Sequence, residues 1–191
     1  MQLAVGGNDN SCTLWIVKDI LSPKLAHILP HKAAVKAVAF CPWSKSLLVT
    51  GGGSKDRKIK FWHTVTGTLI REIQTAGQVT SLLWSVRYKQ LMATFGFGDI
   101  ENPMLLTVFS YPQLSEKLHV RSPTPLRVLS AVPSPRFNAI CVATNDETIR
   151  FYEIWKEVES PIVEAQECQL YNSKLIDFIE GITSTSENII R

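Results

Sequence analysis

One design recurs four times along this chain at a nearly constant interval, and this repeat restricts the possible folds more than any other feature. Each copy has a short apolar run, a turn of Gly, Asn or Asp, and a second run that alternates and carries aromatic residues near its end. The leucines that open three copies, Leu3, Leu47 and Leu91, are 44 residues apart. Val35 and Val79 repeat the same interval. The copies are LAVGGNDNSCTLWIV from Leu3, LLVTGGGSKDRKIKFWHT from Leu47, LMATFGFGDIENPMLLTVFSY from Leu91 and AICVATNDETIRFYEIW from Ala139.

This period matches the four-stranded blades of a β-propeller, which repeat every 40–45 residues or so. In the clearest unit, the segment KIKFWH alternates with the period of two that a strand requires, with Phe61 on one face and Trp62 on the other. We therefore predict an all-β fold, a partial WD-repeat propeller of about three and a half four-stranded blades. The strands predicted in this unit are 35–40, 47–51, 58–63 and 69–74.

The chain divides into predicted blades over 1–155 and an acidic tail over 156–191. The chain begins at the second strand of one unit and continues through two whole units. A fourth unit, which ends at Trp155, has only three evident strands. Because an open array leaves unpaired edges that a closed ring abolishes, we expect this to be the C-terminal part of a longer propeller, or a fragment of one. The tail has three basic and seven acidic residues, and we expect it to be flexible or weakly helical.

Composition excludes several classes of function. A net charge of +3 is too small for a nucleic-acid footprint, and no apolar run is long enough for a membrane helix or a signal peptide, so we expect a soluble chain that is not secreted. The four cysteines have no Cys-x-x-Cys spacing for metal or redox chemistry. We expect them to be small buried side chains of a reduced intracellular protein. They are Cys12, Cys41, Cys141 and Cys168.

The common signatures of enzymes are also absent. There is no nucleophile elbow, zinc-protease helix or Walker loop, and the loop Gly51–Lys55 lacks the second glycine of a phosphate cradle and leads into a predicted strand. The four histidines share no metal-like spacing, and we expect them at the surface or at strand ends. The basic run Lys55–Lys60 is most simply the solvated side of a strand. We therefore predict no enzyme, no cofactor and no metal, and no nucleic-acid or membrane partner.

Polar groups from distant parts of the sequence are predicted to meet on one rim. Because blade strands are antiparallel, the turn between the second and third strands and the link between blades emerge on the same face. The amide, hydroxyl, carboxylate and guanidinium groups there suit a short peptide with charged and amide side chains. The alternative is that Asn, Asp and Gly only form tight turns, which we favour for Asp9 and Asp56. The turns are Gly6–Asn10, Gly53–Asp56 and Asn145–Glu147, and Gln78 and Arg127 lie in or next to links.

The repeats also carry motifs of a known family. The runs GGNDN (6–10), AVKAVAFCPW (34–43), TGGGSKDRKIKFW (50–62), QVTSLLWS (78–85) and DETIRFY (146–152), with the final Ile190-Arg191, closely resemble the fizzy and fizzy-related family. These are WD-repeat activators of the anaphase-promoting complex, a cell-cycle ubiquitin ligase. The resemblance covers about 1–155 and the last two residues, and it implies a non-enzymatic, substrate-recruiting activator of the nucleus and cytoplasm.

The resemblance also implies which residues bind degradation signals. Asn8, Asn10, Ser54, Gln78 and Arg127 match the top-face positions that hold the Lys-Glu-Asn signal. In that role Arg127 would fork onto the glutamate of the signal while the amides satisfy its polar groups. Glu147 matches the acid of the last blade that pairs with the arginine of the destruction box.

Family members end in Ile-Arg, which docks into a tetratricopeptide scaffold subunit of the ligase. The resemblance therefore implies that Ile190 fills an apolar pocket and that Arg191 offers its guanidinium and terminal carboxylate. Three departures point to a divergent branch, such as the fungal meiosis-specific activators: Pro30-His31 replaces Gly-His, no unit has a Trp-Asp dipeptide, and 122–138 is rich in proline. A generic WD-repeat scaffold unrelated to proteolysis is the alternative function.

Overall fold

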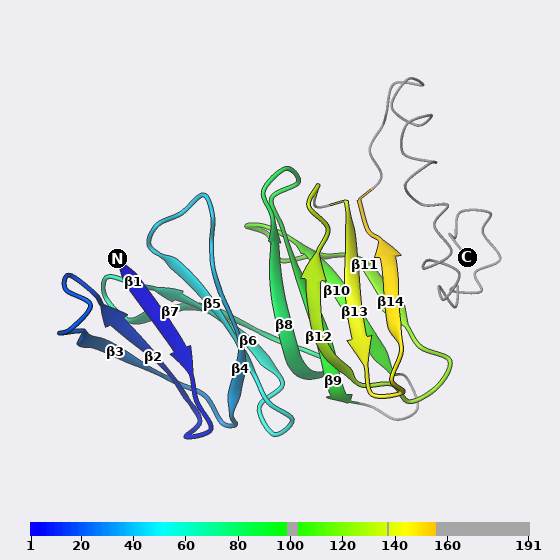
Figure 1. Ribbon diagram of the computed structural model, residues 1–191, viewed down its shortest axis with the longest axis horizontal. Helices are drawn as coiled ribbons and strands as arrows, with labels where there is room; N and C mark the ends of the chain where they lie inside the picture. The colour runs from blue at the N-terminus through cyan, green and yellow to red at the C-terminus, as the bar shows by residue number, and fades with distance from the viewer. Residues whose placement is uncertain (99–102, 137, 156–191) are drawn as a thin grey trace. The chain divides into compact units, whose positions relative to one another are not determined.

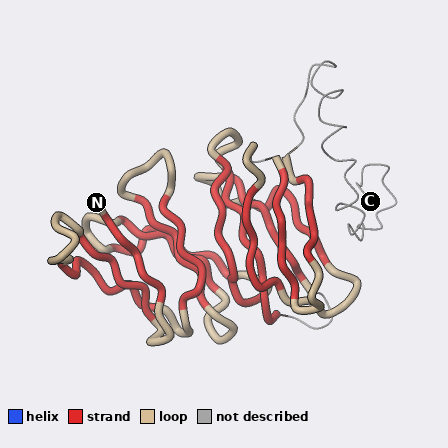
Figure 2. Tube along the Cα trace, viewed as in Figure 1, coloured by secondary structure: helices blue, strands red, loops and turns tan. Residues whose placement is uncertain are grey.

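Every regular element that the structure describes is a β-strand, which confirms the all-β prediction. The computed structural model describes residues 1–98, 103–136 and 138–155 (Figures 1 and 2). The tail 156–191, with its predicted flexibility and Ile190-Arg191 end, lies outside these residues. The strands are β1 (Gln2–Gly6), β2 (Ser11–Ile16), β3 (Lys24–Pro30), β4 (Val35–Phe40), β5 (Leu47–Gly52), β6 (Lys58–His63), β7 (Thr68–Gln74), β8 (Gly77–Ser85), β9 (Gln90–Gly98), β10 (Met104–Ser110), β11 (Glu116–Arg121), β12 (Val128–Pro133), β13 (Ala139–Thr144) and β14 (Ile149–Glu153).

The strands form four sheets in chain order, as the repeat predicts. The sheets hold β1–β3, β4–β7, β8–β11 and β12–β14, and strands that are neighbours in sequence are neighbours in each sheet. The sheet β4–β7 agrees closely with its prediction: β4 and β6 have the predicted bounds, and β5 and β7 are each one residue longer. The proline-rich segment 122–138 still forms a regular strand, β12, in its middle part.

The chain divides into two compact units, Met1–Ser130 and Ala131–Arg191, and the division falls within β12. The first unit contains the first three sheets. The second unit is described from Ala131 to Trp155, except for residue 137, and includes the antiparallel pair β13 and β14.

In the first unit the sheet β4–β7 is packed on both of its faces, which explains why its strands read as apolar on two sides. Leu48 and Trp62 pack with residues of β2 and β3 in one buried cluster. Their neighbours Val49 and Phe61 pack in another cluster with residues of the sheet β8–β11. Because successive strand residues point to opposite faces, the alternation predicted for β6 is confirmed.

A bulge at the start of β4 adjusts this alternation. The pairing with β5 shifts register between Val35 and Ala37. Val35 therefore joins the cluster with β2 and β3, while Ala37, two residues later, joins the cluster on the opposite face. An extra residue in one strand has this effect because it reverses the facing of the residues beyond the bulge.

One of the histidines that we expected at the surface or at a strand end is part of a buried polar network. His31 directly follows β3, at a strand end as predicted, but it is only 8% exposed. Its Nδ1 donates to Asp56 Oδ2 at 2.6 Å and its Nε2 accepts from Thr50 Oγ1 at 2.7 Å. The indole Nε1 of Trp62 donates to the same Thr50 oxygen at 2.8 Å. We call Trp62, Thr50, His31 and Asp56 the buried relay.

The buried relay also corrects the interpretation of Asp56 as a mere turn former. Its carboxylate holds a link residue, His31, against the turn that precedes β6. Burial lowers the pKa of His31, with the hydrogen bond to Asp56 acting in the opposite direction, so the neutral imidazole is the resident form at neutral pH. By contrast, exposed Asp9 accepts a local bond from Ser11 Oγ at 2.9 Å, as a turn residue does.

The cysteines follow the prediction where they are described. Cys12 and Cys41 are buried, Cys141 is half-buried, and all three are free thiols. Burial raises the pKa of the Cys12 thiol to about 11, so it is not a nucleophile at neutral pH. Cys168 lies in the undescribed tail. Within the described ranges, no helix has the length and hydropathy to cross a membrane.

Candidate functional site

The turn between β1 and β2, which carries Asn8 and Asn10, is fastened to the next link by its backbone. The amide of His31 donates to the Asn10 carbonyl at 2.8 Å, and the amide of Val35 donates to the Gly7 carbonyl at 2.9 Å. Asn10 has a φ of 62°, a left-handed conformation that asparagine tolerates better than most residues. Both asparagine side chains are exposed. The backbone is therefore fixed while the amides face solvent.

The turn between β5 and β6, which carries Ser54, is built in the same way. The amide of Arg57 donates to the Gly53 carbonyl at 2.8 Å and its Nε donates to the Ser54 carbonyl at 3.0 Å. The Arg57 carbonyl accepts the amide of Thr75, in the next link, at 2.8 Å. The Ser54 side chain is exposed beside this framework.

These contacts form one continuous border of the first unit. A Cβ placed on Gly53 would lie 3.0 Å from the Ala34 carbonyl oxygen, so the second turn also touches the first link. We call this border the rim: the turns Gly7–Asn10 and Gly53–Arg57, and the links His31–Ala34 and Thr75–Ala76, with the adjoining side chains of Gln78 and Arg127.

Gln78 and Arg127 are 49 positions apart in the sequence, yet they lie against the same residue, Gly96 of β9. A Cβ at Gly96 would be 3.1 Å from Gln78 Oε1 and 3.5 Å from Arg127 Cγ. The Arg127 guanidinium lies over the ring of Phe97, with its Cζ 4.2 Å from the ring centroid. Both Gln78 and Arg127 are half-buried. The structure therefore places the Gln78 amide and the Arg127 side chain against the same residue at one end of the rim.

Glu147 belongs to the second unit, in the turn between β13 and β14. It is exposed and has a φ of 66°. The preceding Asp146 is occupied, since it accepts hydrogen bonds from Thr144, Thr148 and Arg150. These bonds, the one from Thr144 first, hold the pKa of the Asp146 carboxyl well below its usual range. Glu147 is therefore an exposed carboxylate next to one that is already hydrogen-bonded.

The basic run near the rim has partners within the fold. Lys58 pairs with Glu72, and Lys60 Nζ donates to the Pro30 carbonyl at 2.8 Å and lies 5.6 Å from the Trp62 ring centroid. These contacts agree with the prediction of a strand surface. The loop from Gly51 to Lys55 leads into strand β6, so the helix N-terminus of a phosphate cradle is missing there.

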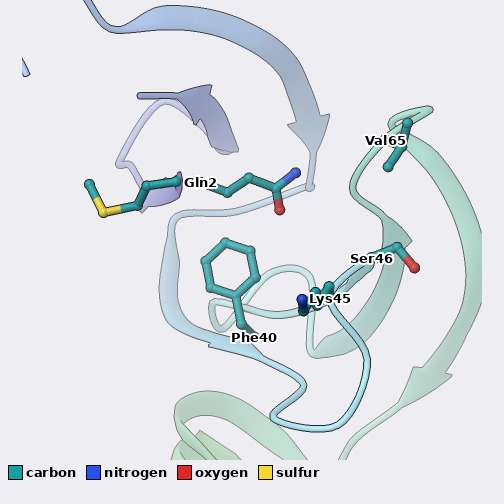
Figure 3. Close-up of a pocket in the computed structure, with 6 residues that line it drawn as sticks. Gln2, Phe40, Lys45, Ser46 and Val65 are labelled. Carbon is teal, nitrogen blue, oxygen red and sulfur yellow. The ribbon is translucent and has the colours of Figure 1, made fainter. Parts of the chain in front are cut away.

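An open pocket lies at the opposite ends of these strands and contains no candidate residue. Phe40 ends β4, Ser46 precedes β5, and Val65 lies in the turn between β6 and β7 (Figure 3). The remaining lining residues are Met1, Gln2 and Lys45. Because each strand of a sheet runs from one face to the other, this pocket is separated from the rim by the length of the strands.

Two features that shape the rim were not expected from the sequence: the buried relay beneath the turn and Phe97 beneath Arg127. Chemically, the rim offers amide, hydroxyl and guanidinium groups, which recognise a polar peptide by hydrogen bonds and charge. In the described part of the chain, no cluster of three or more His, Cys, Asp or Glu side chains is arranged to hold a metal ion.

Comparisons with known proteins agree with this architecture. A family model described as "WD domain, G-beta repeat" matches residues 23–63, which contain β3 to β6. Among solved structures, a chain in the crystal structure of the mitotic checkpoint complex superposes with a TM-score of 0.71 at 38% identity. That match covers 81% of this chain and 46% of the other. The partial WD-repeat fold is therefore confirmed.

Two of the curated relatives have names that refer to meiosis. The chain is 67% identical over 189 residues to the meiosis-specific APC/C activator protein AMA1 of Saccharomyces cerevisiae, which covers 99% of this chain and 32% of that protein. It is 34% identical over 200 residues to meiotic fizzy-related protein 2 of Schizosaccharomyces pombe, which covers 95% of this chain and 39% of that protein.

The chain thus spans about a third of the length of the curated relatives it matches. These similarities confirm the resemblance predicted from the sequence motifs, including the meiosis-specific branch. The two relatives are named as an activator and a fizzy-related protein, which agrees with the prediction that the chain is not an enzyme.

Proposed function

We propose that this chain, a relative of the fizzy and fizzy-related WD-repeat proteins, serves as a substrate-recruiting activator of the anaphase-promoting complex. It holds degradation signals of substrates by side chains and leaves the bond chemistry to the ligase. We place this role in meiotic cells, in the nucleus and cytoplasm where a cell-cycle ligase meets its substrates.

One observation carries the proposal: the rim joins residues from three sheets and a distant segment into one polar border, with Gln78 and Arg127 against Gly96. In the proposed complex, Arg127 donates two parallel hydrogen bonds to the glutamate of a Lys-Glu-Asn signal. The amides of Asn8, Asn10 and Gln78 donate to and accept from the asparagine and the signal's backbone, and the Ser54 hydroxyl adds a further donor and acceptor.

Glu147 is proposed to receive the arginine of a destruction box. The support is local: its neighbour Asp146 is already bound by Arg150 and two threonines, whereas Glu147 is exposed at a sharply turned position. An exposed carboxylate and a ligand arginine form a fork-like pair without displacing an internal bond.

Ile190 and Arg191 are proposed to dock the chain onto a tetratricopeptide scaffold subunit of the ligase. The support here is the sequence alone, since both residues lie outside the described part. An aliphatic side chain followed by a terminal carboxylate and guanidinium suits capture of a chain end in an apolar groove with fixed polar partners.

Peptide titration tests the rim. The affinity of the 191-residue chain for a fluorescent Lys-Glu-Asn peptide is measured by anisotropy, with a triple-alanine peptide as the negative ligand. We expect Arg127→Ala to weaken binding about tenfold or more, because a hydrogen bond to a charged group contributes about 1.5–3 kcal/mol. Asn10→Ala should weaken it less, and Arg87→Ala, at the opposite strand ends, should not.

Equal affinity of the unaltered chain for both peptides would refute the rim assignment and favour a generic WD-repeat scaffold. Ligase docking is tested separately by recovering the complex on the intact chain and on a chain lacking Ile190 and Arg191. We expect recovery to fall with the truncation, and equal recovery would contradict the docking role.

A further inference from the structure

Two segments of the rim each carry an exposed lysine, and contacts beside these lysines hold the two segments together. Lys32 lies in the first link, directly after His31, and Lys55 lies in the second turn, directly before Asp56. His31 Nδ1 donates to the Asp56 carboxylate at 2.6 Å. A Cβ at Gly53 would lie 3.2 Å from the Cβ of the alanine that follows Lys32. The backbones that carry the two lysines are therefore neighbours on the rim.

The fold supplies no counter-charge to these two ammonium groups. Neither lysine makes a hydrogen bond or an ion pair with any residue that the structure describes. The carboxylates of the adjoining turns are engaged elsewhere: Asp56 is 5% exposed and bound to His31. Asp9 accepts from Ser11 and lies back on its own turn, where its Oδ1 would be 2.4 Å from a Cβ at Gly7. Positive charges on neighbouring segments repel each other, so an anionic group of a ligand is favoured there.

Arg57 adds a guanidinium to the same turn. Its Nε donates to the Ser54 carbonyl at 3.0 Å, so the side chain folds back over the turn. Its amide donates to the Gly53 carbonyl at 2.8 Å, and its φ of 49° is uncommon for arginine. Among the residues that the structure describes, none bonds to its two terminal nitrogens. A guanidinium whose Nε is occupied can still bind a carboxylate through these two nitrogens.

We propose that Lys32, Lys55 and Arg57 form a cationic subsite beside the site for the degradation signal. It binds acidic residues that flank the signal in a substrate, so aspartate-rich or glutamate-rich flanks raise the affinity. The inference rests on the proposed function, because Ser54 of the same turn is one of the residues proposed to hold the Lys-Glu-Asn signal. It names a class of substrate, signals with acidic flanks, that the signal itself does not specify.

Three peptides test the inference on the 191-residue chain by fluorescence anisotropy. The first has a Lys-Glu-Asn core with aspartates on both sides, and the second has the same core with asparagines on both sides. The third has aspartates around a triple-alanine core. The flank ratio is the affinity for the first peptide divided by the affinity for the second. This ratio is unaffected by a variant that only changes folding or the binding of the core.

We expect a flank ratio of about three to ten at low salt, because each exposed charge pair contributes little but several act together. High salt should bring the ratio close to unity by screening. Lys32→Gln with Lys55→Gln should reduce the ratio by at least half, whereas arginine at both positions should retain it. Arg57→Gln should also lower the ratio.

The matched control is Lys18→Gln with Lys45→Gln. It removes the same charge from two exposed lysines at the opposite strand ends, Lys18 after β2 and Lys45 before β5. The flank ratio of this control should equal that of the unaltered chain, because neither lysine belongs to the rim.

Three outcomes would overturn the inference. The unaltered chain binds both signal peptides equally, or the control lowers the flank ratio as much as the double variant of Lys32 and Lys55, or the triple-alanine peptide binds as tightly as the aspartate-flanked signal. In the first two outcomes the asparagine-flanked signal still binds and the proposed function stands. If neither signal peptide binds the unaltered chain, the proposed function is refuted, and the inference with it.

Discussion

Replacing Thr50 with valine tests the buried relay most directly. Valine has nearly the shape of threonine, so the packing around position 50 is preserved and only the hydroxyl is removed. In the folded chain, that hydroxyl accepts from Trp62 Nε1 at 2.8 Å and donates to His31 Nε2 at 2.7 Å. Thr50 is fully buried, and Trp62 and His31 are 3% and 8% exposed.

The loss of stability is set by these contacts. A hydrogen bond contributes about 1 kcal/mol net, and each buried partner left without one costs about 1–3 kcal/mol. Two partners are left in this way, so we expect the free energy of unfolding to fall by about 2–6 kcal/mol. This is a large part of the roughly 5–15 kcal/mol that stabilises a typical domain.

Urea unfolding, followed by tryptophan fluorescence and circular dichroism, measures the effect. With a slope of about 2 kcal/mol per molar urea, the midpoint should fall by about 1–3 M. Thr50→Ser should retain most of the stability because it keeps the hydroxyl. Thr13→Val is the matched control: Thr13 Oγ1 accepts from Trp15 Nε1 at 2.9 Å, but on a partly exposed strand where water can replace it. Similar midpoint shifts for Thr50→Val and Thr13→Val would refute this account of the relay.

Two further predictions concern the same region. Because burial lowers the pKa of His31 below its unfolded value of about 6.5, the unfolded chain binds more protons as the pH falls. The free energy of unfolding should therefore be highest above about pH 6.5 and decrease as the pH is lowered below it. A urea midpoint that increases when the pH is lowered from about 7 to about 5.5 would contradict this. Gly52→Ala should destabilise the chain by about 3 kcal/mol in the same assay, because its Cβ would lie 2.0 Å from the buried Asp56 Oδ2. Gly7→Ala is the control, since its Cβ would meet the exposed Asp9 Oδ1, which can move away, and equal losses would contradict the steric argument.

The strands of the sheet β4–β7 were predictable because they are short apolar runs that end at turns, and both faces of the sheet are packed. In β6, for example, Phe61 and Trp62 enter different clusters, and the sequence alternation predicts this division. The bulge between Val35 and Ala37 was not predictable, because neither residue type distinguishes a bulge from regular pairing.

The buried relay was missed for a different reason. His31 follows a proline in a link, and Asp56 lies in a turn 25 residues later, positions where exposed polar residues are common. Only the docking of the link onto the turn encloses them. Phe97 was missed because its partner, Arg127, lies in the link just before β12 and 30 residues further along the chain, so no periodicity relates the two. The general position of the rim was predictable from strand direction, but its internal contacts were not.

The main-chain hydrogen bonds that tie the turns to the links at the rim are accepted by the carbonyls of Gly7, Asn10 and Arg57. Any residue that accepts the same backbone conformation supplies an equivalent carbonyl. The side-chain amide and hydroxyl groups on these turns are thus not needed for the hydrogen bonds between turn and link. Ligand preference can drift by exchange of these side chains during evolution, while the joints between blades stay as they are.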